Sequence, residues 1–238
     1  MKKELLEKIK SRGYWRINFQ PLVDEMKLKS LGDCRSLVEK NHVQLRGWNY
    51  PHYPRRKGDD TDLSPGANYY EGWIEWYDHI EFWRMYQSGQ YLHYRALNDD
   101  WAERNGWDIV ANQTIKPGEQ LSIVGATYLI TEIFQFLSRL AQAGIYDEGV
   151  RVNISLRNTK GRGLSLNDLS RGPLWEEYNT TAEEIPFSEQ YSKEALITKP
   201  QELALDTIVF FFDRFGWHRP NIEVIKKDQD DLLNRRWF

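Results

Sequence analysis

The residues best suited to chemistry in this chain surround Ser88-Gly89, where aromatic and basic side chains alternate along two predicted strands. A two-residue turn with glycine second is typical of a tight β-hairpin. The side chains that this register would place on one face are Phe82, Arg84, Tyr86, Tyr91, His93 and Arg95. Aromatic rings on a sheet can stack on bases while arginines neutralise phosphates, so this face predicts a nucleic-acid or nucleotide surface. The simpler alternative is that a helix covers the face and that its cations pair with carboxylates.

A second group of candidates lies in the long segment from Trp48 to Asn68, which is rich in proline and charge. Loops of about 20 residues are uncommon in compact domains and are disproportionately functional. The residues predicted to contact a partner or an anion are Trp48, Tyr50, His52, Arg55 and Arg56 in this segment and Arg46 just before it. The acids that could instead bind a hard divalent cation are Asp59, Asp60 and Asp62. Mutual neutralisation of these charges at the surface is the plainer interpretation.

A third candidate is the basic turn Lys160-Gly161-Arg162-Gly163, which follows a predicted strand. Its backbone N–H groups and the cations of Lys160 and Arg162 could cradle an anion. The spacing of a phosphate-binding P-loop and the G-x-G-x-x-G dinucleotide motif are both absent. An ordinary exposed turn is the alternative.

Signals for catalysis, metal binding or a cofactor are weak. The chain has no H-E-x-x-H or G-x-S-x-G motif, and its single cysteine, Cys34, lies on the apolar stripe of a predicted helix. A short cluster of acids and one histidine could bind Mg²⁺, and its members are Glu75, Asp78, His79 and Glu81. Strand alternation, however, sends Glu75 and Asp78 to opposite sides. We therefore predict no catalytic residue, no metal ligand and no cofactor.

The elements that must position these residues are predicted by hydrophobic periodicity. Alternation indicates strands over residues 14–20, 43–47, 69–77, 82–86, 91–97 and 150–156, and helical spacing indicates helices over 31–41, 123–144 and 200–215. Residues 164–191 are expected to be mostly loop. The fold class is therefore α+β, a mainly antiparallel sheet packed on two long apolar helices. We expect one compact domain, with a subdivision near 98–121 and a helical C-terminal part over 192–238.

Composition narrows the classes of function. Hydrophobic residues make up 40% of the 238 residues and charged residues 28%, which is typical of a folded protein. The net charge of −3 argues against a global attraction to DNA or anionic membrane. The most apolar stretches are interrupted by charged residues, so no membrane span is expected. A lone cysteine and a charged amphipathic start predict the cytoplasm.

Several segments resemble a family of uncharacterised bacterial proteins. They are Arg12–Trp15, Leu45–His52, Phe82–Gln90, Glu202–Ala204 and Arg214–Trp217. The resemblance implies a bacterial source and a domain that spans most of the chain. It assigns no activity and no catalytic residue.

Three hypotheses for function follow. The first is a non-enzymatic binding or accessory module that acts through a protein or nucleic-acid partner, using the hairpin face and the 48–68 loop, with homodimerisation as an equally direct consequence of an aromatic surface. The second is a metal-dependent phosphodiesterase or nuclease with acidic ligands. The third is a nucleotide-binding sensor.

Overall fold

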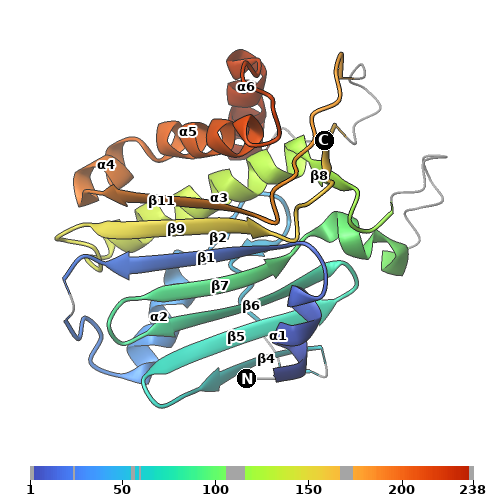
Figure 1. The fold of residues 1–238 in the computed structure, drawn as a ribbon. Coiled ribbons are helices and arrows are strands. Elements are labelled where there is room, and N and C mark those ends of the chain that lie inside the picture. The colour runs from blue at the N-terminus through green and yellow to red at the C-terminus, as the bar shows by residue number, and fades with distance from the viewer. Residues whose placement is uncertain are drawn as a thin grey trace.

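The structure is a computed structural model that describes residues 3–23, 25–54, 57–58, 60–105, 116–166 and 174–235. Its centre is a seven-stranded antiparallel sheet (Figure 1). In spatial order the strands are β11 (Glu184–Tyr191), β9 (Val150–Arg157), β1 (Tyr14–Pro21), β7 (Tyr91–Ala96), β6 (His79–Tyr86), β5 (Tyr69–Trp76) and β4 (Thr61–Pro65). The predicted α+β class is confirmed.

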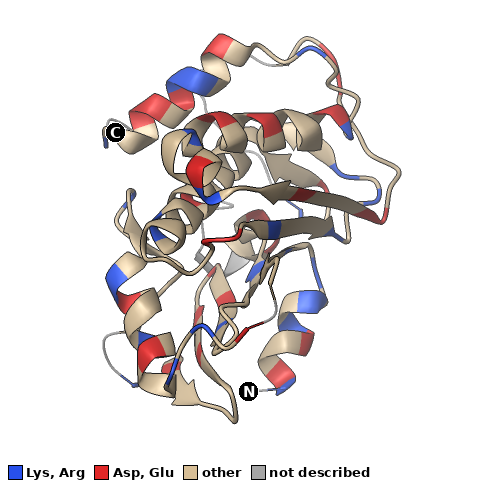
Figure 2. Cartoon of the chain, turned by 90° about the vertical axis from the view of Figure 1, so that its left-hand side faces the viewer, with Lys and Arg blue, Asp and Glu red and all other residues tan. Residues whose placement is uncertain are grey.

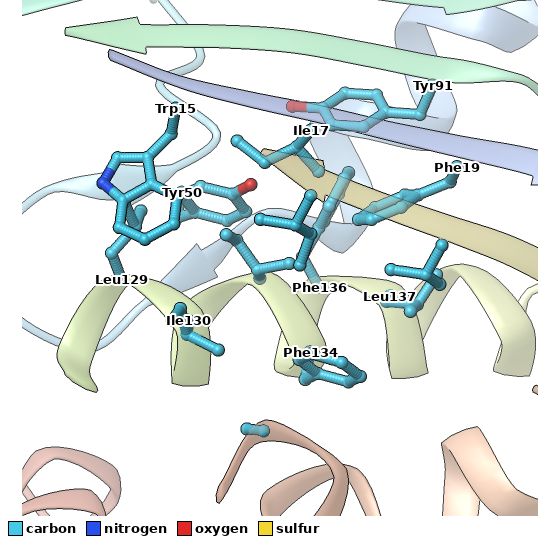
Figure 3. Packing of buried hydrophobic residues seen from close by; sticks show 14 of the residues in the cluster. Trp15, Ile17, Phe19, Tyr50, Tyr91, Leu129, Ile130, Phe134, Phe136 and Leu137 are labelled. Carbon is cyan, nitrogen blue, oxygen red and sulfur yellow. The ribbon is translucent and has the colours of Figure 1, made fainter. Parts of the chain in front are cut away.

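One face of the sheet packs on helix α3 (Ile123–Gln142), which begins at the N-cap Ser122. Alternation along β1 sends Trp15, Ile17 and Phe19 toward this helix, where all three are buried (Figure 3). Burying each such side chain contributes roughly 1.5–3 kcal/mol, so this layer is the main source of stability. The helix was predicted over 123–144 and lies within that range.

Further helices extend the layer around α3. They are α2 (Leu31–Asn41), α4 (Lys193–Thr198), α5 (Pro200–Asp213) and α6 (Ile222–Leu233). The N-terminus of α2 has the capping box that Ser30 and Asp33 form between side chain and backbone. Acidic and basic residues are interleaved along the N-terminal helix α1 (Lys3–Lys10), which lies near the label N in Figure 2.

The opposite face of the sheet is covered at one end by α1 (Lys3–Lys10), which crosses in front of the strands in Figure 1. Leu5 and Ile9 of this helix pack on Phe82 and Trp73 in a second, smaller core. Over the rest of this face, Figure 1 shows no helix among the residues that the structure describes. This is common for antiparallel sheets, which can expose one face to water.

The hairpin between β6 and β7 differs from its predicted register. Met85 pairs with Tyr91, Trp83 with His93 and Glu81 with Arg95, one residue away from the expected pairing. The reason is a three-residue loop, Gln87 to Gly89, that ends with Gly89 at φ +82°. A one-residue slip moves side chains to the other face. Tyr91, His93 and Arg95 therefore point toward α3, while Arg84 and Tyr86 point away from it.

Smaller elements were also missed. Residues 164–191 include the edge strand β11, and the 48–68 segment includes β3 (Asn49–Tyr50) and β4. The predicted second strand shrinks to β2 (Val43–Gln44), which pairs with β3. A parallel pair, β8 (Gln120–Ser122) and β10 (Gly163–Ser165), and the 3₁₀ helix η1 (Asn98–Asn105) complete the described elements. The proposed subdivision near 98–121 falls partly outside the described residues.

The test for membrane spans gives a negative result. None of the helices in the described ranges is both long enough and apolar enough to cross a bilayer.

Candidate ligand-binding site

A pocket of about 400 Å³ opens where β6 and β7 meet the N-terminal half of α3 and the segment from Arg46 to Asn49. Pockets of this size are typical of small-molecule sites. The ionisable side chains that line it are Arg46, Asp78, His79, Arg95, Asp99 and Glu132. Titratable groups gathered in a cleft are the most direct structural signal of a functional site.

The observed register explains why strand residues reach the pocket. Glu81 and Arg95 are cross-strand partners on the face toward α3, and His79 precedes Glu81 by two residues, so all three share that face. Glu132 lies on α3 and is buried. Arg46 approaches from the segment between β2 and β3. The site thus combines residues far apart in the chain.

Glu81 is fully buried behind the pocket and is the centre of a hydrogen-bonded cluster. Its Oε2 accepts from Arg95 Nη1 at 2.8 Å and lies 3.1 Å from His79 Nε2, and its Oε1 accepts from the His52 backbone N–H at 2.5 Å. His93 Nε2 lies 3.6 Å from the same carboxylate. A buried charge is tolerated when it is paired in this way.

The ionisation of this cluster follows from its surroundings. Burial alone would raise the pKa of Glu81, but His79 and His93 hold that pKa well below its usual value. Burial also lowers the pKa of both histidines, so their rings are neutral near pH 7. A neutral imidazole retains one N–H, and at His79 the Nε2–H is suited to donate to Glu81.

The guanidinium of Arg46, the second in the pocket, is also bonded to a carboxylate of the protein. Arg46 donates to both carboxylate oxygens of Glu132, from Nε at 3.1 Å and from Nη2 at 2.8 Å. This two-point geometry is the strongest that arginine forms with a carboxylate. Both cations that line the pocket are therefore held by carboxylates of the protein itself.

Two acids are left without such a partner. In the described part of the chain, no ion pair within 4.0 Å joins Asp78 or Asp99 to a cation. Asp99 accepts one hydrogen bond, from the Ser122 backbone N–H at 3.1 Å. Burial raises the pKa of Asp99 to about 6. Within the described residues, the pocket therefore has two carboxylates that no direct ion pair neutralises.

Aromatic rings form the rim of the pocket. The Trp48 side chain is 39% exposed, and its ring stacks on His79 at a centroid distance of 5.0 Å. The Trp48 ring also contacts Trp76 at a centroid distance of 4.9 Å. An exposed tryptophan next to unpaired carboxylates is a surface on which a ligand can both stack and bond.

The structure brings together most of the residues that were predicted to bind. Arg46, Trp48 and Arg95 line the pocket. Four others lie directly behind it around Glu81, and these are Tyr50, His52, Tyr91 and His93. Tyr50 Oη lies 3.2 Å from His93 Nδ1, which links the two segments. The residues meet under α3, not on an open sheet face.

Other predicted residues lie elsewhere. Arg84 faces away from α3, bonds to Glu71 at 2.8 Å and stacks on Tyr69 at 4.1 Å, and Tyr86 shares its face. The Arg162 guanidinium is buried against Asp100, so it is not presented to an anion as expected. Lys160 is exposed near it. Arg55 and Arg56 lie outside the described residues.

The sequence analysis weighed Asp78 and Glu81 as members of a Mg²⁺-binding cluster and set that cluster aside, so no acid was predicted to bind a ligand here. The sequence could have pointed to Glu81 as a site residue, because this acid stands between the apolar residues Ile80 and Phe82 on a strand. It could have pointed to Glu132 too, because this acid lies within the apolar pattern of a long helix. It could not have pointed to Asp99, since Asp99 belongs to a polar, irregular stretch.

No family model, curated protein or solved structure matches this chain. The resemblance to uncharacterised bacterial proteins therefore stays a prediction. Within the described ranges, no group of three or more His, Cys, Asp and Glu side chains is arranged to hold a metal ion.

Proposed function

We propose that this protein is a binding module and that the pocket takes an organic cation, such as a primary or quaternary amine. The observation that supports this most is the pair of carboxylates, Asp78 and Asp99, which lie near the exposed ring of Trp48 and form no ion pair with any cation that the structure describes. Carboxylates attract ammonium groups, and aromatic faces attract cations through their quadrupole. A bound cation would neutralise the negative charge of these two carboxylates.

The same geometry disfavours a phosphate ligand. Arg46 and Arg95 are already bonded to Glu132 and Glu81, so neither guanidinium is free to neutralise a phosphate. The unpaired carboxylates would repel it. A nucleotide-binding sensor that depends on phosphate contacts is therefore the weaker proposal.

The other hypotheses gain less support. The observed hairpin register splits the expected aromatic and basic face between the two sides of the sheet. Of the acids considered for a nuclease, Glu75 pairs with Lys8 at 2.5 Å and Asp62 pairs with Lys57 at 3.2 Å. Asp59 lies outside the described residues. A nucleic-acid surface and a metal-dependent nuclease remain predictions.

Thermal unfolding with a panel of probes tests the proposal. Choline, agmatine and capped lysine (N-acetyl-lysine methylamide) are the cations, and ATP and glucose are the anionic and neutral probes. A ligand at 100 times its Kd stabilises the native state by about 2.7 kcal/mol, which is a rise in Tm of roughly 5 °C or more at this chain length. We expect that rise with at least one cation and none with ATP or glucose.

Two variants locate the binding. Asp99→Asn and Trp48→Ala should each remove most of the shift. Asp147→Asn, which disrupts an exposed pair with Lys193, and Trp175→Ala, which removes a fully exposed ring, are the matched controls and should retain it. A rise with ATP alone, or a rise that survives Asp99→Asn and Trp48→Ala, would overturn the proposal.

A further inference from the structure

The aromatic rim extends well beyond the pocket. Trp48, Trp76 and Tyr77 are 39%, 41% and 51% exposed, and they form a continuous row in which Trp76 contacts Trp48 at 4.9 Å and Tyr77 at 5.3 Å. We call these three residues the aromatic platform. Single exposed hydrophobic residues are ordinary, but a contiguous group of large rings is typical of an interaction surface.

The backbone of the platform is unusual as well. Trp76 pairs with His79, so Tyr77 and Asp78 form a two-residue turn between β5 and β6. Tyr77 has φ +48°, a conformation that bulky residues rarely adopt. Glycine, asparagine or aspartate would occupy this turn position at lower cost. Packing of the hairpin does not require a tyrosine there, because its side chain is half exposed. A strained residue that the fold does not need is a pointer to function.

The turn also connects the platform to the pocket. Its second residue, Asp78, lines the pocket, whereas the first, Tyr77, extends the platform away from it. Trp48 belongs to both, since it lines the pocket and its ring contacts that of Trp76. A ligand that uses the two regions together must have a cationic group and additional apolar surface outside the pocket.

We infer that the cation is a lysine or arginine side chain presented by a segment of another protein, whose flanking residues cover the aromatic platform. This inference rests on the proposed cation pocket and names its partner. Tryptophan and tyrosine are enriched where protein interfaces have most of their binding energy. A free amine would fill the pocket and leave the platform bare. A nucleic acid would bring phosphates to Asp78 and Asp99, and an oligosaccharide would leave their charge unpaired.

The experiment compares one cation alone with the same cation in a peptide. The probes are capped lysine and an array of capped pentapeptides with a fixed central lysine and varied apolar and aromatic flanks. Affinities are measured by tryptophan fluorescence and calorimetry on the full chain. We expect the best peptide to bind at least tenfold tighter than capped lysine, and its central lysine-to-glutamine version to lose that affinity.

Variants separate the platform from the pocket. Trp76→Ala and Tyr77→Asn should each remove the peptide's advantage and leave capped lysine unaffected. The second of these keeps a residue that suits the turn conformation, so it tests the ring without unfolding the hairpin. Asp99→Asn should weaken both probes, and Trp175→Ala should weaken neither.

The outcomes distinguish the two proposals. If capped lysine binds and no peptide binds more tightly, the inference about a protein partner is wrong and the cation pocket stands. If Trp76→Ala weakens capped lysine as much as the peptide, the platform has no separate role and the inference is again wrong. If neither probe binds, the inference about a protein partner is wrong, and the cation pocket fails with it when choline and agmatine also leave the Tm unchanged.

Discussion

Asp99 and Asp100 are neighbours on η1, yet their carboxylates have opposite surroundings. Asp100 is 1% exposed and accepts hydrogen bonds from the backbone N–H groups of Gly13 and Gly118 at 2.7 and 2.8 Å and from Arg162 Nη1 at 2.8 Å. Arg162 also donates to backbone carbonyls. Every oxygen of Asp100 is used within the protein, so this acid joins three distant segments.

Asp99 turns toward the pocket and accepts one backbone hydrogen bond. Its raised pKa of about 6 reports a charge that burial disfavours and that the nearby Arg162 compensates only in part. The comparison teaches how to separate structural from functional acids in one molecule. A saturated carboxylate stabilises the fold, whereas an unsaturated one retains bonding capacity for something outside the chain.

Substitution of Asp100 is expected to change the free energy of unfolding the most. Asp100→Ala leaves the buried Arg162 guanidinium without its carboxylate, and breaking a buried pair in this way costs about 3–5 kcal/mol. Urea denaturation at pH 7 measures the loss, with Asp99→Ala as the matched control. Equal destabilisation by the two substitutions would end the contrast between these acids.

Glu81 should behave like Asp100 although it lies next to the pocket. Glu81→Gln removes the charge that Arg95 faces and should cost about 3 kcal/mol at pH 7. Because the folded pKa of Glu81 is lowered, its stabilisation is present above the unfolded pKa of about 4 and is lost as pH falls through the folded pKa. The difference in free energy of unfolding between wild type and variant should therefore stay constant from pH 8 to pH 5 and decrease in stronger acid. A difference that disappears by pH 6 would contradict this assignment.

Asp99→Asn should raise the free energy of unfolding, whereas the substitutions at Asp100 and Glu81 lower it. The folded pKa of about 6 lies above the unfolded value, so the native state binds the proton more tightly and loses stability as pH rises from about 4 to above 6. Removing the charge should stabilise the protein by about 1 kcal/mol at pH 7 and by little at pH 4. Denaturant titrations at the two pH values measure the difference. Destabilisation at pH 7 would show that Asp99 is a structural acid after all.

Substitution in the aromatic platform is expected to change the free energy of unfolding the least. Tyr77→Asn replaces a bulky residue at φ +48° with one that tolerates this conformation, and should raise stability by about 0.5 kcal/mol. The midpoint of urea unfolding is sensitive enough to detect it. A fall in stability would mean that the tyrosine ring supports the hairpin, which would weaken its assignment to binding.

The elements of the fold with clear periodicity were predictable. Helix α3 and strands β1 and β9 lie close to their predicted bounds, because their apolar residues recur at one spacing over many residues. Strand β11 was not predicted. It contains Pro186 and three exposed polar residues, since it is an edge strand with little of its surface buried.

The candidate site was predictable in part. Trp48, His52 and His93 were selected for their chemistry, and they do gather in one place. The predicted face of His93 was wrong, because the loop from Gln87 to Gly89 has three residues. Sequence alone did not distinguish this loop from a two-residue turn. The pairing of Arg46 with Glu132, 86 residues apart, depends on tertiary packing that no local pattern reports.

The place of β1 in the sheet has a consequence for biosynthesis. This strand lies between β7 and β9, whose paired residues follow it by more than 70 and by nearly 130 or more positions along the chain. A nascent polypeptide would therefore carry an apolar strand with two unsatisfied edges until most of the protein has left the ribosome. Such delayed pairing slows folding and exposes surfaces that aggregate. Yield in cells should accordingly respond to chaperone levels more than the final stability of the protein would suggest.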